Sequence, residues 1–281
     1  MIPAVSHSSL SPRHQEALQR AFVLLENRNF AARLAEYAGQ PVDRALRVMP
    51  KMASDGLNRV VEAAVLNCLK LAIGSIEPTS KAPPARRLTS LLAGINGGVS
   101  GFFGAAALPL ELPLTTTLML RAIADIARHQ GEDLSRLEAR LACVEVFALG
   151  TPRSAKRMDV GYYASRALLS KLADDAAAYL LERSTVSATA PVVNSLVTEI
   201  VSRFGVVVTE RFAASAVPVL GAVGGATVNV IFMNHFQRVA LGHFTIRRLE
   251  RRYGASVVRY HYEHLSSHRS QAEARSRRPG A

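Results

Sequence analysis

Two long stretches without charge constrain the fold of this chain more than any other feature. The first spans the 33 residues between Arg87 and Arg121 with one charged residue, Glu111, and the second covers residues 212–237. Small residues that recur every three or four positions form a stripe on one helix face, which a second helix can approach closely. The glycines at this spacing are Gly94, Gly97, Gly98, Gly101 and Gly104 in the first stretch, and Gly221, Gly224 and Gly225 in the second. We therefore expect close helix packing at the centre of the protein.

The composition favours helices throughout. Apolar residues make up 49% of the 281 residues and aromatic residues only 6%, so the core consists mainly of Ala, Val and Leu. Val206, Val207 and Val208 form the best β-prone run, which is too short to indicate a sheet. We predict an all-α protein, a multi-helix bundle with two glycine-rich apolar helical hairpins packed at its centre. Three parts are expected: an amphipathic helical extension over 1–50, a helical domain over 51–265 and a basic disordered tail over 266–281.

Capping residues and helix breakers indicate where the helices lie. Two prolines four residues apart, Pro109 and Pro113, predict a bend, with a new helix from Leu114 to Gly131. Ser135 and Glu138 have the spacing of a capping box that starts the next helix. The other expected helices cover 12–38, 54–74, 161–182, 191–211 and the long segment from Pro218 to Tyr253.

Several sequence blocks follow one another in a characteristic order. They are GGVSGFFG at 97–104, LPLELP at 108–113 with Arg121 and Asp125, EVFALG at 145–150, Tyr162-Tyr163 with Arg166, PVLGAVGG at 218–225 running on to Asn229, His243-Phe244, and RLER at 248–251 with Tyr253-Gly254. Together they resemble the EcsC protein family over roughly residues 50–265. The resemblance implies a bacterial, mainly helical protein of a family without an established reaction or ligand, and it is compatible with membrane association.

The net charge of +12 is concentrated at the two ends of the chain. From Arg238 onward there are ten basic and three acidic residues. Each Lys or Arg near an anionic leaflet contributes about 1 kcal/mol of attraction, so anionic membrane lipid or a membrane protein is the expected partner. Nucleic acid is a poor alternative because no helix-turn-helix, zinc-finger or aromatic-interleaved basic pattern accompanies the charge.

The compartment follows from the cysteines and the N-terminal residues. Cys68 and Cys143 stand in apolar helical contexts and have the character of small core residues in a reducing compartment. The first residues lack the basic and continuous apolar segments of a signal peptide. We expect a cytoplasmic protein, peripheral at the inner face of the cytoplasmic membrane.

Three arrangements of the uncharged stretches stay open at this point. Residues 88–108 match the ~20 residues that span a bilayer, but they contain Asn96 and five glycines. A two-pass hairpin would have to bury Arg121 and Asp125, at about 2.5–3.5 kcal/mol each. The stretches can therefore be core helices of a bundle, shallow or re-entrant membrane segments, or spanning helices.

No reaction is recognisable in the sequence. Nucleophile-elbow, His-Glu-x-x-His and Walker motifs are absent, so we predict no cofactor and leave open whether the chain is an enzyme. The nearest approach to a metal motif is formed by His261, His264 and His268, which share a helix face. A polar surface helix explains that spacing equally well, and we predict no metal.

Polar residues inside apolar helices are the candidate site, because buried polar groups need partners. They are Asn96, Glu111, Arg121, Asp125, Glu145, Tyr162, Arg166, Asn229, Asn234 and His235. In a structural network, Glu111 would cap the following helix and Arg121 would pair with Asp125; alternatively, the residues line a ligand pocket between the glycine hairpins. The predicted function is a membrane-associated accessory or interaction protein. The alternative is a soluble small-molecule-binding protein or enzyme that uses the polar cluster.

Overall fold

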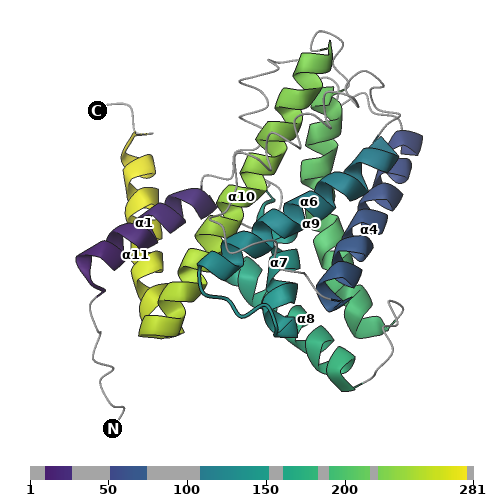
Figure 1. Ribbon diagram of the computed structural model, residues 1–281. Helices are drawn as coiled ribbons and strands as arrows, with labels where there is room; N and C mark the ends of the chain where they lie inside the picture. The colour runs from purple at the N-terminus through teal and green to yellow at the C-terminus, as the bar shows by residue number, and fades with distance from the viewer. Residues whose placement is uncertain are drawn as a thin grey trace.

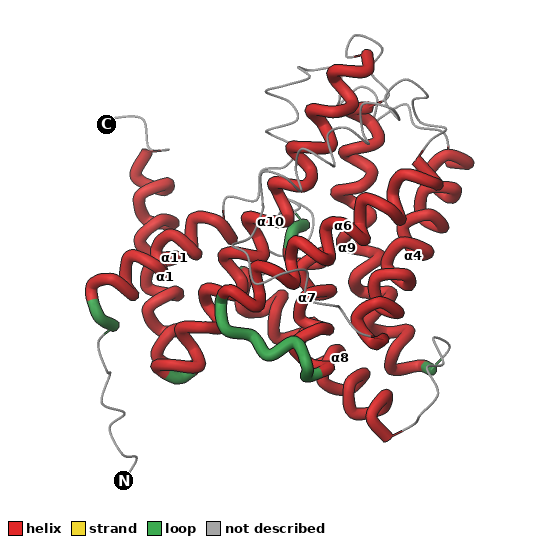
Figure 2. Tube along the Cα trace, viewed as in Figure 1, coloured by secondary structure: helices red, strands yellow, loops and turns green. Residues whose placement is uncertain are grey.

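The protein is built from helices packed on helices. The computed structural model describes residues 10–26, 51–74, 108–151, 161–182, 190–215 and 221–276. Eight helices and no strands occur in these ranges (Figure 2), so the all-α prediction is confirmed. The helices are α1 (Pro12–Glu26), α4 (Lys51–Gly74), α6 (Leu108–His129), α7 (Leu137–Leu149), α8 (Tyr162–Glu182), α9 (Pro191–Ser215), α10 (Gly221–Tyr253) and α11 (Ala255–Ser276). The first glycine stripe, Gly94 to Gly104, lies outside the described residues, and the second begins α10.

Helix α7 forms the centre of the bundle. Every residue from Leu141 to Leu149 is buried, and α4, α6, α8, α9 and α10 all pack against this helix. A helix that is apolar on all sides belongs in a core. The ring of Phe147 extends this core, because it lies 5.0 Å from the ring of Phe204 and 5.7 Å from that of Phe236, centroid to centroid.

Helix α6 begins earlier than the prolines suggest. Its first residue is Leu108, six positions before the predicted start, and it continues through Pro113. Pro109 lies in the first turn, where the amide groups have no partner within the helix, so its missing N–H costs no helical hydrogen bond. The hydroxyl groups of Thr116 and Thr117 donate to the carbonyl of Pro113 at 3.1 and 2.8 Å.

The predicted capping box does not form. Helix α7 starts at Leu137 with Arg136 at the N-cap position and no side-chain cap. Ser135 instead bonds to Asp133, whose carboxylate accepts the Ser135 amide at 3.0 Å and its hydroxyl at 2.7 Å. Asp133 therefore forms a local turn with Ser135 that competes with capping.

Two helices from opposite ends of the sequence pack beside the C-terminal half of α10 (Figure 1). Gly254, with φ +87°, ends α10 and lets α11 turn back. The Tyr262 hydroxyl of α11 donates to the Glu26 carboxylate of α1 at 2.7 Å. Helix α11 runs to Ser276, so it continues into the segment for which the sequence indicates a tail.

Candidate functional site

Glu145 is the buried carboxylate of the central helix α7. It is 2% exposed, and its nearest hydrogen-bond donor is the Ser170 hydroxyl of α8, at 3.4 Å. Burial raises the pKa of Glu145 to about 7, although the positive charges of Arg247 and Arg166 oppose the rise. Glu145 is thus a buried acid that titrates near neutrality.

Arg166 and Glu250 join α8 to α10 beside Glu145. The guanidinium donates two hydrogen bonds, of 2.8 and 2.7 Å, to the two carboxylate oxygens of Glu250. The Tyr163 hydroxyl donates a third bond to the same carboxylate at 3.0 Å. Bidentate pairs of this kind fix geometry as well as charge.

A second fork joins α10 to the turn before α7. Arg247 donates to both carboxylate oxygens of Glu132, at 2.9 and 3.0 Å, and Arg251 donates to the same group. Burial alone would raise the pKa of Glu132, but hydrogen bonds and charge from Arg247 and Arg251 lower it. Glu250 and Glu132 are thus each paired with an arginine of a neighbouring helix.

Tyr162 contacts a buried histidine that the sequence analysis did not place in the site. Its hydroxyl lies 2.9 Å from Nδ1 of His243, and both residues are fully buried. Burial, reinforced by the charges of Arg166 and Arg247, holds the pKa of His243 well below its ordinary value. His243 is therefore neutral. The polar core cluster consists of Glu145, Tyr162, Arg166, His243 and Arg247 with the carboxylate partners Glu250 and Glu132.

Glu111 lies in a different part of the bundle. Its carboxylate pairs with Arg211, whose side chain is 3% exposed and whose guanidinium lies over the Phe232 ring at 5.0 Å. Glu111 thus joins α6 to α9 and does not act only on its own helix. Arg211 is the last charged residue before the second uncharged stretch, and this position is the sequence feature that could have identified it as a buried partner.

The remaining predicted residues do not join the core cluster. Arg121 is exposed, and Asp125 pairs with Arg128 at 3.0 Å in place of the expected Arg121. On the N-terminal half of α10, His235 Nε2 lies 2.6 Å from the Gly150 carbonyl oxygen, Asn229 is buried and Asn234 is half-buried. Asn96 lies outside the described residues.

The three histidines of α11 do not come together as a metal site in the described part of the chain. No group of three His, Cys, Asp or Glu side chains that could hold a metal occurs there. The rings of His264 and His268 lie 4.4 Å apart, and His261 packs against Tyr260.

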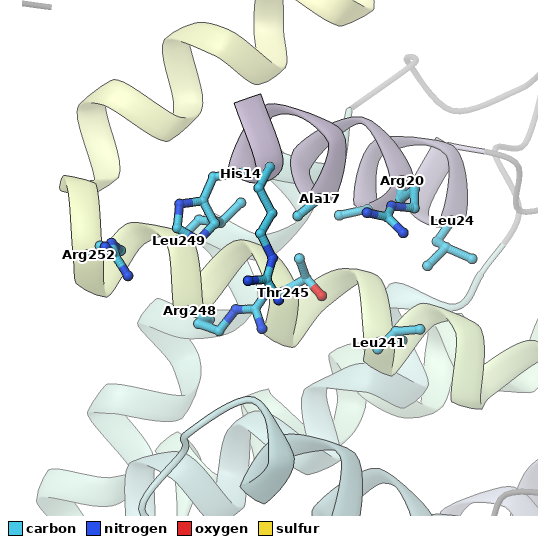
Figure 3. A pocket seen from close by; sticks show the side chains of 11 residues that line it. His14, Ala17, Arg20, Leu24, Leu241, Thr245, Arg248, Leu249 and Arg252 are labelled. Atoms are coloured by element: carbon cyan, nitrogen blue, oxygen red, sulfur yellow. The ribbon is translucent and has the colours of Figure 1, made fainter. Parts of the chain in front are cut away.

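A cleft of about 550 Å³ opens between α1 and α10 (Figure 3). Its basic lining residues are Arg13, His14, Arg20, Arg248 and Arg252, and no Asp or Glu of the described residues lines it. They come from both ends of the sequence, so local sequence reasoning could not group them. The two basic ends of the chain therefore meet at one place.

The cleft exists because α1 packs closely and antiparallel on α10. At one end, His14 Nδ1 lies 2.7 Å from the Tyr253 hydroxyl. At the other, Gly242 faces Leu25 and Ala21, where a Cβ would come within 2.8 Å of the Leu25 Cγ atom. The missing side chain at Gly242 permits this approach.

The model of the EcsC protein family matches residues 40–249, well over half of the chain. The chain belongs to the EcsC protein family. No curated protein and no solved structure matches it. In this EcsC protein the polar core cluster lies almost wholly inside the matched region. Helix α1, Arg252 and α11 lie outside it, so the cleft joins the matched region to segments on either side.

The two sites of this EcsC protein have different chemical capacities. In the polar core cluster, each of Arg166 and Arg247 already has a carboxylate partner, which suits a structural network. In the cleft, cations face one another and no carboxylate of the part of the chain that the structure describes lies in the lining, which suits an anion.

Proposed function

We propose that this EcsC protein is a membrane-associated accessory protein that docks peripherally on anionic lipid at the inner face of the cytoplasmic membrane. The observation that carries the proposal is the cleft between α1 and α10, where arginines from both ends of the chain gather on one exposed face. Arg13, Arg20, Arg248 and Arg252 are all exposed there.

The charge of this face suits attraction to a membrane surface. At about 1 kcal/mol for each basic residue near an anionic leaflet, four arginines contribute about 4 kcal/mol, or roughly a thousandfold in affinity. Within the described ranges, the acidic neighbour that pairs with them is Glu16, which contacts Arg20 at 3.5 Å through side chains that are 71% and 72% exposed. A pair that exposed is weak, so it removes little of the attraction.

Helix α9 is the one described helix that is long and apolar enough to cross a membrane, over Pro191–Ala213. Core helices of soluble proteins pass the same test. The exposed positions of α9 include Asn194, Ser195, Thr198 and Ser202, and a polar stripe suits water better than lipid. This pattern favours peripheral docking over insertion of α9.

The rival function is a small-molecule site or an enzyme in the polar core cluster. It has weaker support because Arg166 and Arg247 are occupied by Glu250 and Glu132. A ligand would have to displace a bidentate ion pair to reach either guanidinium.

Co-sedimentation with vesicles tests the docking proposal. The full chain is mixed with vesicles of phosphatidylglycerol and phosphatidylcholine, or of phosphatidylcholine alone. The test variant carries Arg13→Gln, Arg20→Gln, Arg248→Gln and Arg252→Gln. The control variant loses the same charge at exposed positions on other helices, through Arg59→Gln, Lys70→Gln, Arg121→Gln and Lys171→Gln.

We expect binding to the anionic vesicles only, about a thousandfold weaker for the test variant. The control variant should bind within about threefold of the natural chain, since its charges lie away from the docking face. Equal loss in both variants would mean that net charge, and not this face, holds the protein. Failure of the natural chain to bind anionic vesicles would overturn the proposal.

A further inference from the structure

One end of the cleft between α1 and α10 is more cationic and the other is more apolar; we call them the cationic end and the apolar end. Figure 3 shows His14, Arg248 and Arg252 with Leu249 at the cationic end, and Leu24 and Leu241 with Arg20 at the apolar end. The antiparallel packing of α1 on α10 produces this order, because residues early in α1 lie beside residues late in α10.

The charges at the cationic end are not neutralised within the described residues. There, no ion pair joins Arg13, Arg248 or Arg252 to a carboxylate. Burial lowers the pKa of Arg248, and the charges of Arg13 and Arg251 lower it further. The pKa of His14 is also lowered, first by burial and then by Arg252, Arg248 and Arg13. An anion among these groups would relieve their mutual repulsion.

The apolar end continues past the cleft along α1. A second hollow, of about 480 Å³, shares Arg20 and Leu24 with the cleft and adds Glu16, Gln19 and Val23, of which Val23 is 43% exposed. Apolar side chains that lead away from a cationic pocket, here Leu24 and Val23, fit a molecule with a charged head and a hydrocarbon tail.

We propose that this cleft binds one phospholipid from the membrane surface, and that the headgroup of this lipid is a phosphodiester with a net charge of −1, as in phosphatidylglycerol. The phosphate lies between the guanidinium groups of Arg13, Arg248 and Arg252, which can donate paired hydrogen bonds to its oxygens. The acyl chain lies over Leu24 and Leu241. The inference rests on the proposed docking function and deepens it, because it adds a one-to-one lipid site to general attraction by charge.

The phosphate belongs to a lipid and not to a free anion, because inorganic phosphate would leave the apolar end of the cleft without a binding partner. Besides the arginines, the polar lining residues are Thr245 and His14, and they offer little to a sugar or a base. A nucleic acid would need stacking on Phe, Tyr or Trp rings, and none of the described lining residues is one of these.

Titration calorimetry on the full chain tests the site with soluble probes. The probes are dihexanoyl phosphatidylglycerol below its micelle concentration, dihexanoyl phosphatidylcholine, glycerol phosphate and inorganic phosphate. The variants are Arg248→Gln for the cationic end, Leu24→Ser for the apolar end and Arg121→Gln as an exposed control away from the cleft. Circular dichroism of each variant shows whether it is folded.

We expect one phosphatidylglycerol per chain, at least about tenfold tighter than phosphatidylcholine or either free phosphate. Arg248→Gln should weaken phosphatidylglycerol binding about tenfold. Leu24→Ser should weaken lipid binding several-fold and leave glycerol phosphate binding unchanged. Arg121→Gln should change neither.

Equal affinity for phosphatidylglycerol and inorganic phosphate would overturn the proposal in favour of a free-anion site. No binding of the soluble lipid by a chain that still binds anionic vesicles would also overturn it, and would leave the docking function standing. Binding of the soluble lipid without vesicle binding would support the site and remove the docking function.

Discussion

Gly242 of α10 lies against Leu25 of α1, so close that a Cβ at position 242 would come within 2.8 Å of the Leu25 Cγ atom and 3.2 Å of the Ala21 carbonyl oxygen. The two residues are separated by most of the sequence, and their contact seats the first helix on the last third of the chain. The arginines of α1 and α10 therefore share one cleft because of a contact between two apolar residues.

The contact at Gly242 can be tested with a single added methyl group. Gly242→Ala should destabilise the seating of α1 by about 2 kcal/mol, as overpacked sites usually do. Hydrogen exchange should show faster exchange of the α1 amides, and affinity for anionic vesicles should fall.

The matched control for that substitution is Gly205→Ala in α9. There a Cβ would meet only the Asn58 side chain, at 4.0 Å, so alanine should stabilise the helix by up to about 1 kcal/mol. An increase in the midpoint of thermal unfolding for Gly242→Ala, like that expected for Gly205→Ala, would contradict the close packing of α1 on α10.

Glu145 should make stability depend on pH near neutrality. Its pKa rises from 4.5 in the unfolded chain to about 7 in the folded one, so the folded state binds more protons between these values. The contribution of Glu145 to the free energy of unfolding is therefore largest below pH 4.5. It decreases as the pH rises to about 7 and is constant at higher pH. At about 1.4 kcal/mol per pKa unit, the decrease amounts to about 3 kcal/mol.

Glu145→Gln removes this titration, so a comparison of the variant with the natural chain separates the effect of Glu145 from that of the other titratable groups. Urea unfolding of both proteins from pH 5 to pH 8 should show the variant gaining stability relative to the natural chain by up to about 3 kcal/mol. A difference between the two proteins that does not change with pH would mean that Glu145 titrates at its ordinary pKa.

The Glu111 and Arg211 pair should behave as a coupled unit. Removing one partner leaves the other buried and uncompensated, which usually costs 3–5 kcal/mol, whereas apolar replacement of both is often tolerated. Glu111→Leu and Arg211→Met should each destabilise by about 3 kcal/mol, and the double variant by less than the sum. Additive effects in urea unfolding would contradict an ion pair between α6 and α9.

His14 should report the electrostatics of the cleft. Burial lowers its pKa, the charges of Arg252, Arg248 and Arg13 lower it further, and Ser11 and Tyr253 contact its ring. Neutralising Arg252 to Gln should raise the His14 pKa, and soluble phosphatidylglycerol should raise it in the natural chain. Proton NMR titration measures both shifts; a His14 pKa unchanged by the lipid would place the phosphate elsewhere.

Local sequence patterns predicted that helices form and where several of them begin or end, but not which helices pack against one another. The predicted start of a helix at Pro191 and the predicted end of the long segment at Tyr253 match α9 and α10, because backbone chemistry acts within a few residues. The predicted cap at Ser135 is wrong, because the nearer carboxylate of Asp133 takes both donors.

The candidate site was only partly predictable for the same reason. Glu145, Tyr162 and Arg166 were identified as polar groups in apolar helices, and they do come together. His243, which contacts Tyr162, and Arg211, which pairs with Glu111 elsewhere in the bundle, lie far along the chain from their partners. Helical periodicity shows which residues are buried but not which helix faces them. The cleft between α1 and α10 could therefore not be predicted from the sequence.

The most direct test of the central proposal is fractionation of the untagged protein from its native cells, with salt and alkaline-carbonate washes of the membrane pellet. Peripheral docking through Arg13, Arg20, Arg248 and Arg252 predicts recovery with the membranes and release by high salt, because salt screens exposed charges. Recovery only in the soluble fraction, or retention on the membrane through the carbonate wash, would contradict the proposal.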